Sequence, residues 1–298
     1  MWLQTPVQRS TKPTLLPTFA SRVDDLSRRI SSRASSALTG SQFVESVRAL
    51  DGRQREHAVL QEVLRGNVPT FLRHLVPITL AAQSVRALPA TVFVMPDYLA
   101  SGSDDDFLRT PMNLETAKTI AAQFGFLLPT KRIVNAVYAQ SAFHFVPEPL
   151  TPGPQMSSTD YYRRHNEMIE AQARAGAVAP GALVSGHKKD VVVTNLLART
   201  PDRIAIYGWQ RPGGTPIQPL STVHGACDED YSHGIRLVSE MAWENGGLRP
   251  VRDILQDPVK APVLSDEGPL SVFAGDPQPA ATLATFALAR IIHEGASS

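Results

Sequence analysis

This sequence has a single cysteine, no long apolar run and almost no excess of charge of either sign. Cys227 is the single cysteine in 298 residues, which excludes a framework of internal disulfide bonds. No apolar run approaches the roughly 20 residues that a membrane-spanning helix needs, so we expect no membrane partner. Basic residues number 29 and acidic residues 28, and such a balance argues against a nucleic-acid partner held by its phosphates.

Recognisable nucleotide and secretion signals are also missing. The chain has no glycine-rich loop of the kind that cradles phosphates or dinucleotides. Residues 1–40 are rich in arginine and serine and hold no apolar stretch long enough for a secretory signal peptide. We therefore predict a basic flexible tail over residues 1–40 and a cytoplasmic location. The length of the chain allows one large domain, which we place at residues 41–298.

Helical patterns dominate the first half of this domain. Apolar residues recur at three- and four-residue steps from about Ser41 until Gly66 and Asn67 end the pattern. Asn113 is a plausible N-cap for a helix ending before Gly125. Further helices are predicted after the cap Thr130, over about 159–175, and over the helix-compatible segment 280–292.

Extended patterns follow in the second half. After a proline-rich surface loop at 145–155, strands are predicted within 188–197, 202–210, 215–223 and 233–243, separated by turn residues. An earlier buried strand is predicted within 91–99. Helices first and strands later indicate an α+β fold, with a helical N-terminal half packed on a mainly antiparallel, β-rich C-terminal half.

The stretch VHGACDEDYSHGIRLVS at 223–239 concentrates groups that carry protons. If residues 231–239 are extended, His233 shares a face with two apolar residues and lies near the rim of the core. An acid beside a histidine holds one tautomer and makes the ring a better base, with a pKa close to neutrality. We therefore predict His233 as general acid or base, Asp230 as its orienting partner and His224 as a second proton carrier.

Three interpretations of this stretch remain open. In the first, Ser232 or Cys227 is the nucleophile of a hydrolase. In the second, His224, Asp230 and His233 bind a divalent metal with help from His187 or Asp190, although no metal signature has this spacing. In the third, the histidines only brace a turn. A lone cysteine is more often buried and inert than reactive, and no cofactor is predicted.

Binding residues are expected around this stretch. Arg236 has the planar fork that binds a carboxylate or an oxyanion. His187 and Lys188 directly precede an apolar strand. We expect them at the end of that strand, since residues at strand ends commonly line clefts. Tyr207 and Trp209 are two residues apart and would form one wall for stacking. His165, on a predicted helix, is expected to be an ordinary surface or capping group.

Two groups of known proteins resemble parts of this sequence. The segments GHKKDVVVTN, IYGW, IQPLSTVHG and DYSHGIRLV resemble a bacterial family without an assigned function, over most of the chain after residue 40. The pair VHG and SHGIRL resembles the active-site segment of L,D-transpeptidases, β-rich cell-wall enzymes with a catalytic cysteine. This resemblance implies that His224 matches their first histidine, His233 the catalytic base and Arg236 the arginine. Ile235 stands where their cysteine would be, and the two histidines lie closer together than in that family.

Together these features predict a hydrolase acting on a polar peptide or glycan by histidine–aspartate acid–base chemistry. A non-catalytic carbohydrate- or peptide-binding module is the alternative from another class, and a metal-dependent hydrolase is a third. A small molecule, peptide or glycan is the expected partner. The oligomeric state does not follow from the sequence.

Overall fold

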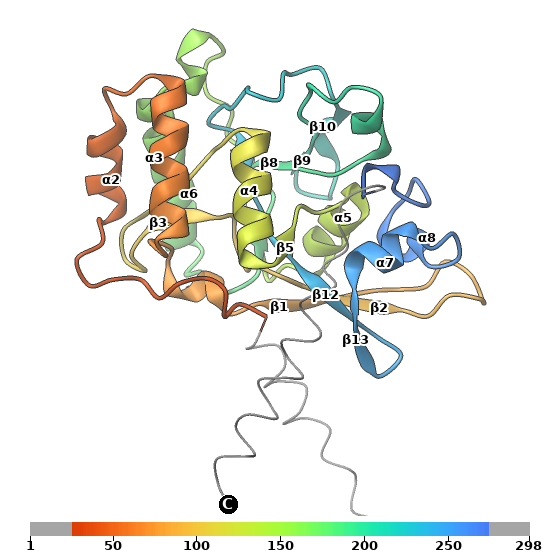
Figure 1. Ribbon diagram of the computed structural model, residues 1–298. Helices are drawn as coiled ribbons and strands as arrows, with labels where there is room; N and C mark the ends of the chain where they lie inside the picture. Colours follow the sequence, from red (N-terminus) through yellow and green to blue (C-terminus); the bar gives the residue numbers. More distant parts are fainter. Residues whose placement is uncertain (1–25, 274–298) are drawn as a thin grey trace, which may run out of the picture.

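The computed structural model describes residues 26–273, which form a mixed α+β fold (Figure 1). The helices are α2 (Gly40–Val47), α3 (Gly52–Leu64), α4 (Leu114–Phe124), α5 (Lys131–Gln140), α6 (Thr159–Ala175), α7 (Val251–Gln256) and α8 (Ala261–Leu264). Short 3-10 helices are η1 (Thr70–Arg73), η2 (Pro154–Ser157), η3 (Asn195–Ala198) and η4 (Ser271–Phe273).

The strands contribute to several sheets. They are β1 (Val76–Leu80), β2 (Ala90–Val94), β3 (Ala100–Gly102), β4 (Phe107–Arg109), β5 (Phe126–Leu127), β6 (Phe143–His144), β7 (Val184–Ser185), β8 (Lys189–Val191), β9 (Ile206–Gln210), β10 (Pro216–Ser221), β11 (His233–Gly234), β12 (Val238–Glu244) and β13 (Gly247–Pro250). One sheet has the order β1-β2-β12-β13 with β5 paired to β12, and a second has the order β10-β9-β8-β11. The first sheet joins strands from both halves of the chain, so the predicted division into a helical and a β-rich half is approximate.

Capping residues fix the ends of the helices. The Asn113 side chain accepts a hydrogen bond from Thr116 N, and α4 ends at Gly125, whose φ of 78° suits glycine. Thr130 caps α5 in the same way, and α6 runs over the predicted 159–175. The first predicted helix is two helices, because Asp51 caps α3 and breaks the periodic run after α2.

The predicted strand within 233–243 is also divided. Its first part is β11 in the second sheet and its last part is β12 in the first. Between them, the carbonyls of Ile235 and Leu237 accept hydrogen bonds from Leu99 N and Met95 N. Both side chains are fully buried in the core, so the segment crosses the interior between the two sheets.

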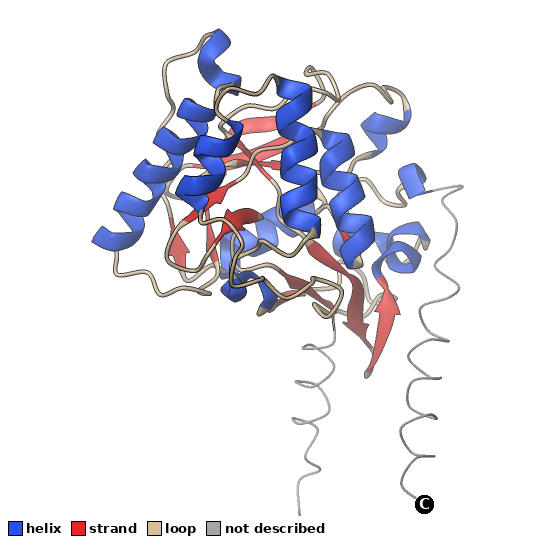
Figure 2. Ribbon diagram, turned by 60° about the vertical axis from the view of Figure 1, so that its left-hand side comes forward, coloured by secondary structure: helices blue, strands red, loops and turns tan. Residues whose placement is uncertain are grey.

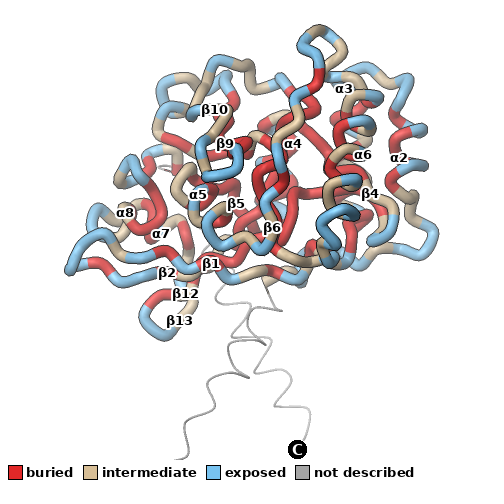
Figure 3. The backbone as a smooth tube through the Cα atoms, turned by 180° about the vertical axis from the view of Figure 1, so that it is seen from behind, coloured by how far each residue is buried: buried red, intermediate tan, exposed pale blue. Residues whose placement is uncertain are grey.

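The core lies between the helices and the sheets. In Figure 1, α2, α3 and α4 stand upright over the level of β1 and β2, and Figure 2 shows strands running behind the helices. Buried segments lie inside the molecule and exposed ones on its outer surfaces (Figure 3). The proline-rich stretch 145–155 is largely a loop, and its Leu150 packs in a core cluster.

The predicted tail joins this core earlier than expected. Ile30 is only 4% exposed and packs in the main cluster. Arg33 Nε donates to Asn67 Oδ1 at 2.9 Å and to Gly102 O at 3.0 Å. Residues Ile30 and Arg33 of the predicted tail therefore contact the folded part of the chain, while residues 1–25 and the predicted helix 280–292 lie outside the described residues. Between residues 26 and 273, no helix is long and apolar enough to cross a membrane.

Candidate functional site

Two short parallel strands bring the predicted catalytic residues together. β8 and β11 pair so that His233 lies opposite Lys189 and Gly234 opposite Asp190. His233 Nε2 lies 3.7 Å from Asp230 Oδ2, and Lys189 Nζ lies 3.9 Å from the same oxygen. Both distances are too long for a hydrogen bond, but they are short enough for electrostatic interaction of the Asp230 carboxylate with each side chain.

His224 lies on the solvent side of this group. Its ring centroid is 6.3 Å from that of His233, with the planes at 70°. The His224 side chain is 42% exposed, whereas that of His233 is 1% exposed. A turn in which Gly225 N donates to Asp228 Oδ2 follows His224. We call Lys189, His224, Asp230 and His233 the His233 cluster.

The cluster holds a neutral imidazole next to an ionised carboxylate. Burial lowers the pKa of His233 to about 4, although the charge of Asp230 acts in the opposite direction. Burial acts to raise the pKa of Asp230, but His233 and the nearby lysine hold that pKa below its usual value. The prediction of a histidine pKa close to neutrality is therefore wrong, because the removal of water outweighs the single carboxylate. His233 is thus unprotonated at neutral pH, and neither of its ring nitrogens has a hydrogen-bond partner among the described residues.

Neither predicted nucleophile forms a hydrogen bond with His233. Ser232 is fully buried, and its hydroxyl donates to Asp230 Oδ1. Its backbone N–H donates to the same oxygen at 2.6 Å, which makes a local turn typical of aspartate. Cys227, expected to be buried, is exposed. A serine held this way directs its proton to Asp230 and not to a histidine, so the geometry does not activate it.

His187 belongs to a different group. Its Nε2 lies 2.9 Å from Asp97 Oδ1, and Arg109 donates to Asp97 Oδ2 from Nε and Nη2 at 2.9 and 2.7 Å. Burial alone would raise the pKa of Asp97, but Arg109 and His187 together hold it below its usual value. His187 therefore does not complete a metal site with the His233 cluster. Among residues 26–273, no three His, Cys, Asp or Glu are placed to hold a metal ion.

Arg236 is bonded within the protein. It is 1% exposed, and it donates to Met95 O at 2.8 Å and to Val184 O at 2.7 Å. Its guanidinium also lies over the ring of Tyr98, 4.6 Å from the centroid. With these partners Arg236 joins three chain segments and is not placed to bind a substrate anion. A lone arginine in a sequence gives no sign that carbonyl groups will surround it.

Tyr207 and Trp209 do not form one wall. The Tyr207 hydroxyl donates to Asn135 Oδ1 at 2.8 Å, and its ring packs in a small cluster with Val134. Trp209 packs in another cluster, with Tyr231 among its members. The strand turns between them, because Gly208 has φ 112° and Trp209 has φ 55°, which a bulky residue seldom adopts. Both side chains are about 5% exposed or less, which leaves no ring free for stacking.

Lys188 is buried with its amine held inside. Its Nζ donates to Tyr231 O at 2.6 Å, and burial lowers its pKa to about 7. The neighbouring residue, Lys189, is the one that reaches Asp230, and the sequence-based prediction missed it. Adjacent residues of a strand face opposite sides, so the sequence indicates that only one of Lys188 and Lys189 can face Asp230.

Replacing Lys188 by methionine should stabilise the protein at pH 7. The folded pKa of about 7 lies below the unfolded value, so the folded chain binds fewer protons between those values and wild-type stability rises with pH above 7. We expect a gain on the order of 1–2 kcal/mol at pH 7, after loss of the bond to Tyr231. Urea unfolding from pH 7 to 10 would measure it. A gain that does not shrink as the pH rises would contradict the assigned pKa shift.

His165 is a second group whose burial was not foreseen. It was expected at the surface, but it is 1% exposed, and its ring packs 4.9 Å from that of Tyr231. Burial lowers its pKa to about 2, and its Nδ1 has no hydrogen-bond partner within the described part of the chain. The apolar face of α6 places it inside, and the helical pattern in the sequence contains that signal.

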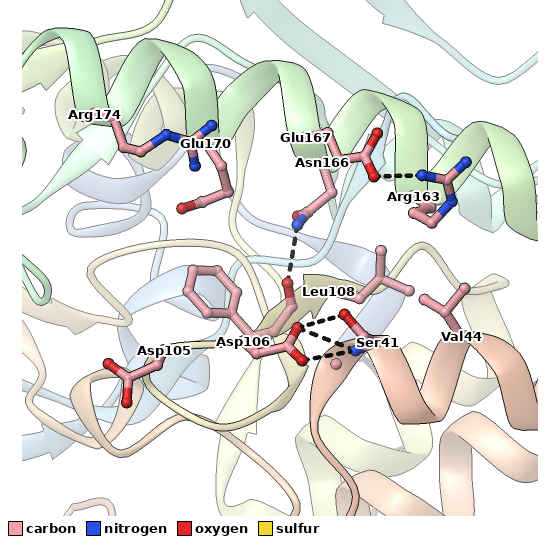
Figure 4. A pocket seen from close by; sticks show the side chains of 12 residues that line it. Ser41, Val44, Asp105, Asp106, Leu108, Arg163, Asn166, Glu167, Glu170 and Arg174 are labelled. Carbon is pink, nitrogen blue, oxygen red and sulfur yellow. Dashed lines mark hydrogen bonds and ion pairs between the residues drawn. The ribbon is translucent and has the colours of Figure 1, made fainter.

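A pocket of about 220 Å³ lies away from these residues, between α6 and the segment 105–108 (Figure 4). From α6 come Arg163, Asn166, Glu167, Glu170 and Arg174, and its other lining residues include Ser41, Asp105 and Asp106. Asp106 accepts a hydrogen bond from Ser41 N, in the first turn of α2, at 3.0 Å, and Asn166 Nδ2 donates to Phe107 O. None of the predicted site residues lines this pocket, so it does not belong to the His233 cluster.

In the transpeptidase resemblance, the residue after Gly234 should be the catalytic cysteine. Ile235 occupies this position, fully buried in the main core, immediately after β11. The thiol of Cys227 lies on the exposed loop before that strand. No protein-family model, curated protein or solved structure matches this chain.

Proposed function

We propose that this protein is a hydrolase that cleaves a polar peptide or glycan at the His233 cluster by acid–base chemistry. One observation carries the proposal: a neutral imidazole with both nitrogens unbonded lies against an ionised Asp230, behind the half-exposed His224. Buried imidazole nitrogens in native proteins usually have a partner. A reacting molecule or a water that it activates would supply that partner here.

The residues divide the work of amide hydrolysis in a simple way. His233 takes a proton from water, and the water oxygen bonds to the carbonyl carbon. Asp230 stabilises the imidazolium that forms, as a carboxylate does for a catalytic histidine. Lys189, beside the same carboxylate, stabilises negative charge on the carbonyl oxygen. The carbon–nitrogen bond then breaks as the imidazolium returns its proton to the leaving nitrogen.

In this proposal, the position of the His224 side chain determines whether a substrate can reach His233. Asp230 and Lys189 each keep 12% of their side chains exposed, and His224 keeps 42%. These three side chains form the outer surface of the cluster, so rotation of His224 would open the way to His233. Side-chain rotations of exposed residues are fast compared with catalysis.

The pH profile is expected to differ from that of an ordinary histidine. Since the pKa of His233 is lowered to about 4, the base form is present above that value. Hydrolysis should be nearly constant from about pH 5.5 to 8 and fall as the pH drops toward 4. Initial rates on 4-nitroanilide peptides and 4-nitrophenyl glycosides would measure this, with circular dichroism confirming the fold at each pH. A half-maximal rate near the ordinary histidine pKa of about 6.5 would contradict the assignment, as would failure to hydrolyse any member of the panel.

A further inference from the structure

An apolar groove runs beside α4, and no residue of the His233 cluster lines it. Its cavity volume is about 390 Å³. Its apolar lining is Leu114, Ala121, Ala122, Phe126, Leu127, Leu128, Val193, Leu197, Ala198, Pro201, Val272 and Phe273, and its charged lining is Lys118 and Arg252. Such a groove, with two charged residues among fourteen, is suited to apolar side chains and offers little to a polar ligand.

The described chain ends inside this groove. Val272 and Phe273 form part of its wall and belong to η4, the last described element. The guanidinium of Arg252 lies 4.8 Å from the centre of the Phe273 ring. The next residues of the chain therefore start at the groove itself.

The sequence that follows Phe273 contains an apolar segment that could fill the groove. Residues 280–292 read AATLATFALARII, and they lie outside the described residues. In a helix, Leu283, Phe286 and Ala287 would share one face at three- and four-residue spacing, and Arg290 would lie on that face at its C-terminal end. The connection between Phe273 and Ala280 is the six residues 274–279, and its seven Cα–Cα steps reach at most about 25 Å. A helix of thirteen residues, 280–292, measures about 20 Å, and the connection lets it begin anywhere within about 25 Å of Phe273.

We propose that residues 280–292 pack their apolar face into this groove of their own chain. The short connection gives the segment an effective local concentration in the millimolar range, which a separate molecule seldom reaches. Burial of the Leu283 and Phe286 side chains in the groove, over the exposed Ala122 and Ala198, supplies the free energy. The N-terminal segment 1–25 is the less favoured occupant, because Phe273 in the groove wall is joined by a short connection to residues 280–292. This inference is independent of the proposed hydrolysis.

Cysteine labelling in the full-length chain tests the proposal. Ala198 lines the groove and is exposed among the described residues, so Ala198→Cys in a Cys227→Ser background reports whether the groove is covered. We expect reaction with Ellman's reagent to be at least about tenfold slower than at an exposed thiol. Adding Leu283→Asp and Phe286→Asp should remove this protection.

Matched controls separate the possible occupants. Thr282→Asp with Thr285→Asp adds the same charge to the same segment beside the proposed face, and it should leave the labelling slow. Equal rates in all three proteins would overturn the proposal. Protection that grows with protein concentration would assign the groove to a second copy. Protection lost on Leu15→Asp with Leu16→Asp, and not with the changes at 283 and 286, would assign it to the N-terminal segment. Either result would also overturn the proposal.

Discussion

Replacing Arg109 by methionine should lower the free energy of unfolding by about 3–5 kcal/mol, because it leaves a buried carboxylate without its main partner. Asp97 is 5% exposed, and both of its hydrogen bonds at Oδ2 come from Arg109. Methionine keeps the apolar part of the side chain, so the loss is chiefly electrostatic. His187 and the backbone N–H of Tyr98 remain on the other oxygen.

The acid sensitivity of the variant provides a second measurement. In the wild type the pKa of Asp97 is lowered, so its stabilising contribution is present above the unfolded value and is lost only as the pH falls below about 4. Without Arg109, burial raises that folded pKa, so protonation of the buried carboxyl relieves part of the destabilisation as the pH falls, and the loss of stability should be smaller at pH 5 than at pH 7. Urea unfolding at pH 7 and pH 5 would measure both effects.

Two further variants serve as controls for this prediction: one disrupts an exposed ion pair, and the other removes both charges of the buried pair. Arg48 pairs with Asp160 at 3.1 Å with its side chain 45% exposed, so Arg48→Met should cost no more than about 1 kcal/mol. Combining Arg109→Met with Asp97→Asn removes both charges and should recover much of the lost stability. If Arg109→Met unfolds within about 1 kcal/mol of the wild type, the buried ion pair contributes no more than an exposed one, contrary to the prediction.

This ion pair matters because it connects the elements around the site. Asp97 follows β2 and Arg109 ends β4, while Asn166 and Glu170 of α6 accept hydrogen bonds from Arg109 Nη1 at 3.2 and 2.7 Å. The hydrogen bond between His187 and Asp97 connects the loop before β8 to the same network. The network therefore fixes the strand that carries Lys189 relative to α6.

Local signals in the sequence predicted much of the helical structure. Asn113, Thr130 and Gly125 act within three or four residues of the helix ends, so their effect depends on neighbouring residues alone. The caps of α4 and α5 therefore agree with the prediction. Asp51 is an equally local signal, and the split between α2 and α3 could have been predicted from it.

Contacts between distant residues could not be predicted in this way. Asp97 and His187 are 90 positions apart, and the sequence holds no periodicity that joins them. The division of 233–243 between two sheets depends on partners in β2 and β8. His224, Asp230 and His233 were correctly predicted as neighbours because they lie within ten residues of one another. The lowered histidine pKa could not be foreseen, since burial is set by the whole fold.

The largest expected effect on activity is that of His233→Gln. Glutamine keeps a polar side chain but cannot act as a base, so hydrolysis should fall by about 10²–10⁴-fold. The fold should persist, because neither ring nitrogen of His233 has a hydrogen-bond partner among residues 26–273. His57→Gln is the matched control, since His57 is exposed on α3, and it should retain wild-type activity.

The direct measurement is therefore kcat/KM of wild type, His233→Gln and His57→Gln on whichever nitroanilide peptide or nitrophenyl glycoside the wild type hydrolyses. A loss of about 10²-fold or more at position 233 alone, with unchanged thermal unfolding, is the predicted result. Turnover of His233→Gln equal to that of the wild type would contradict acid–base catalysis at this cluster.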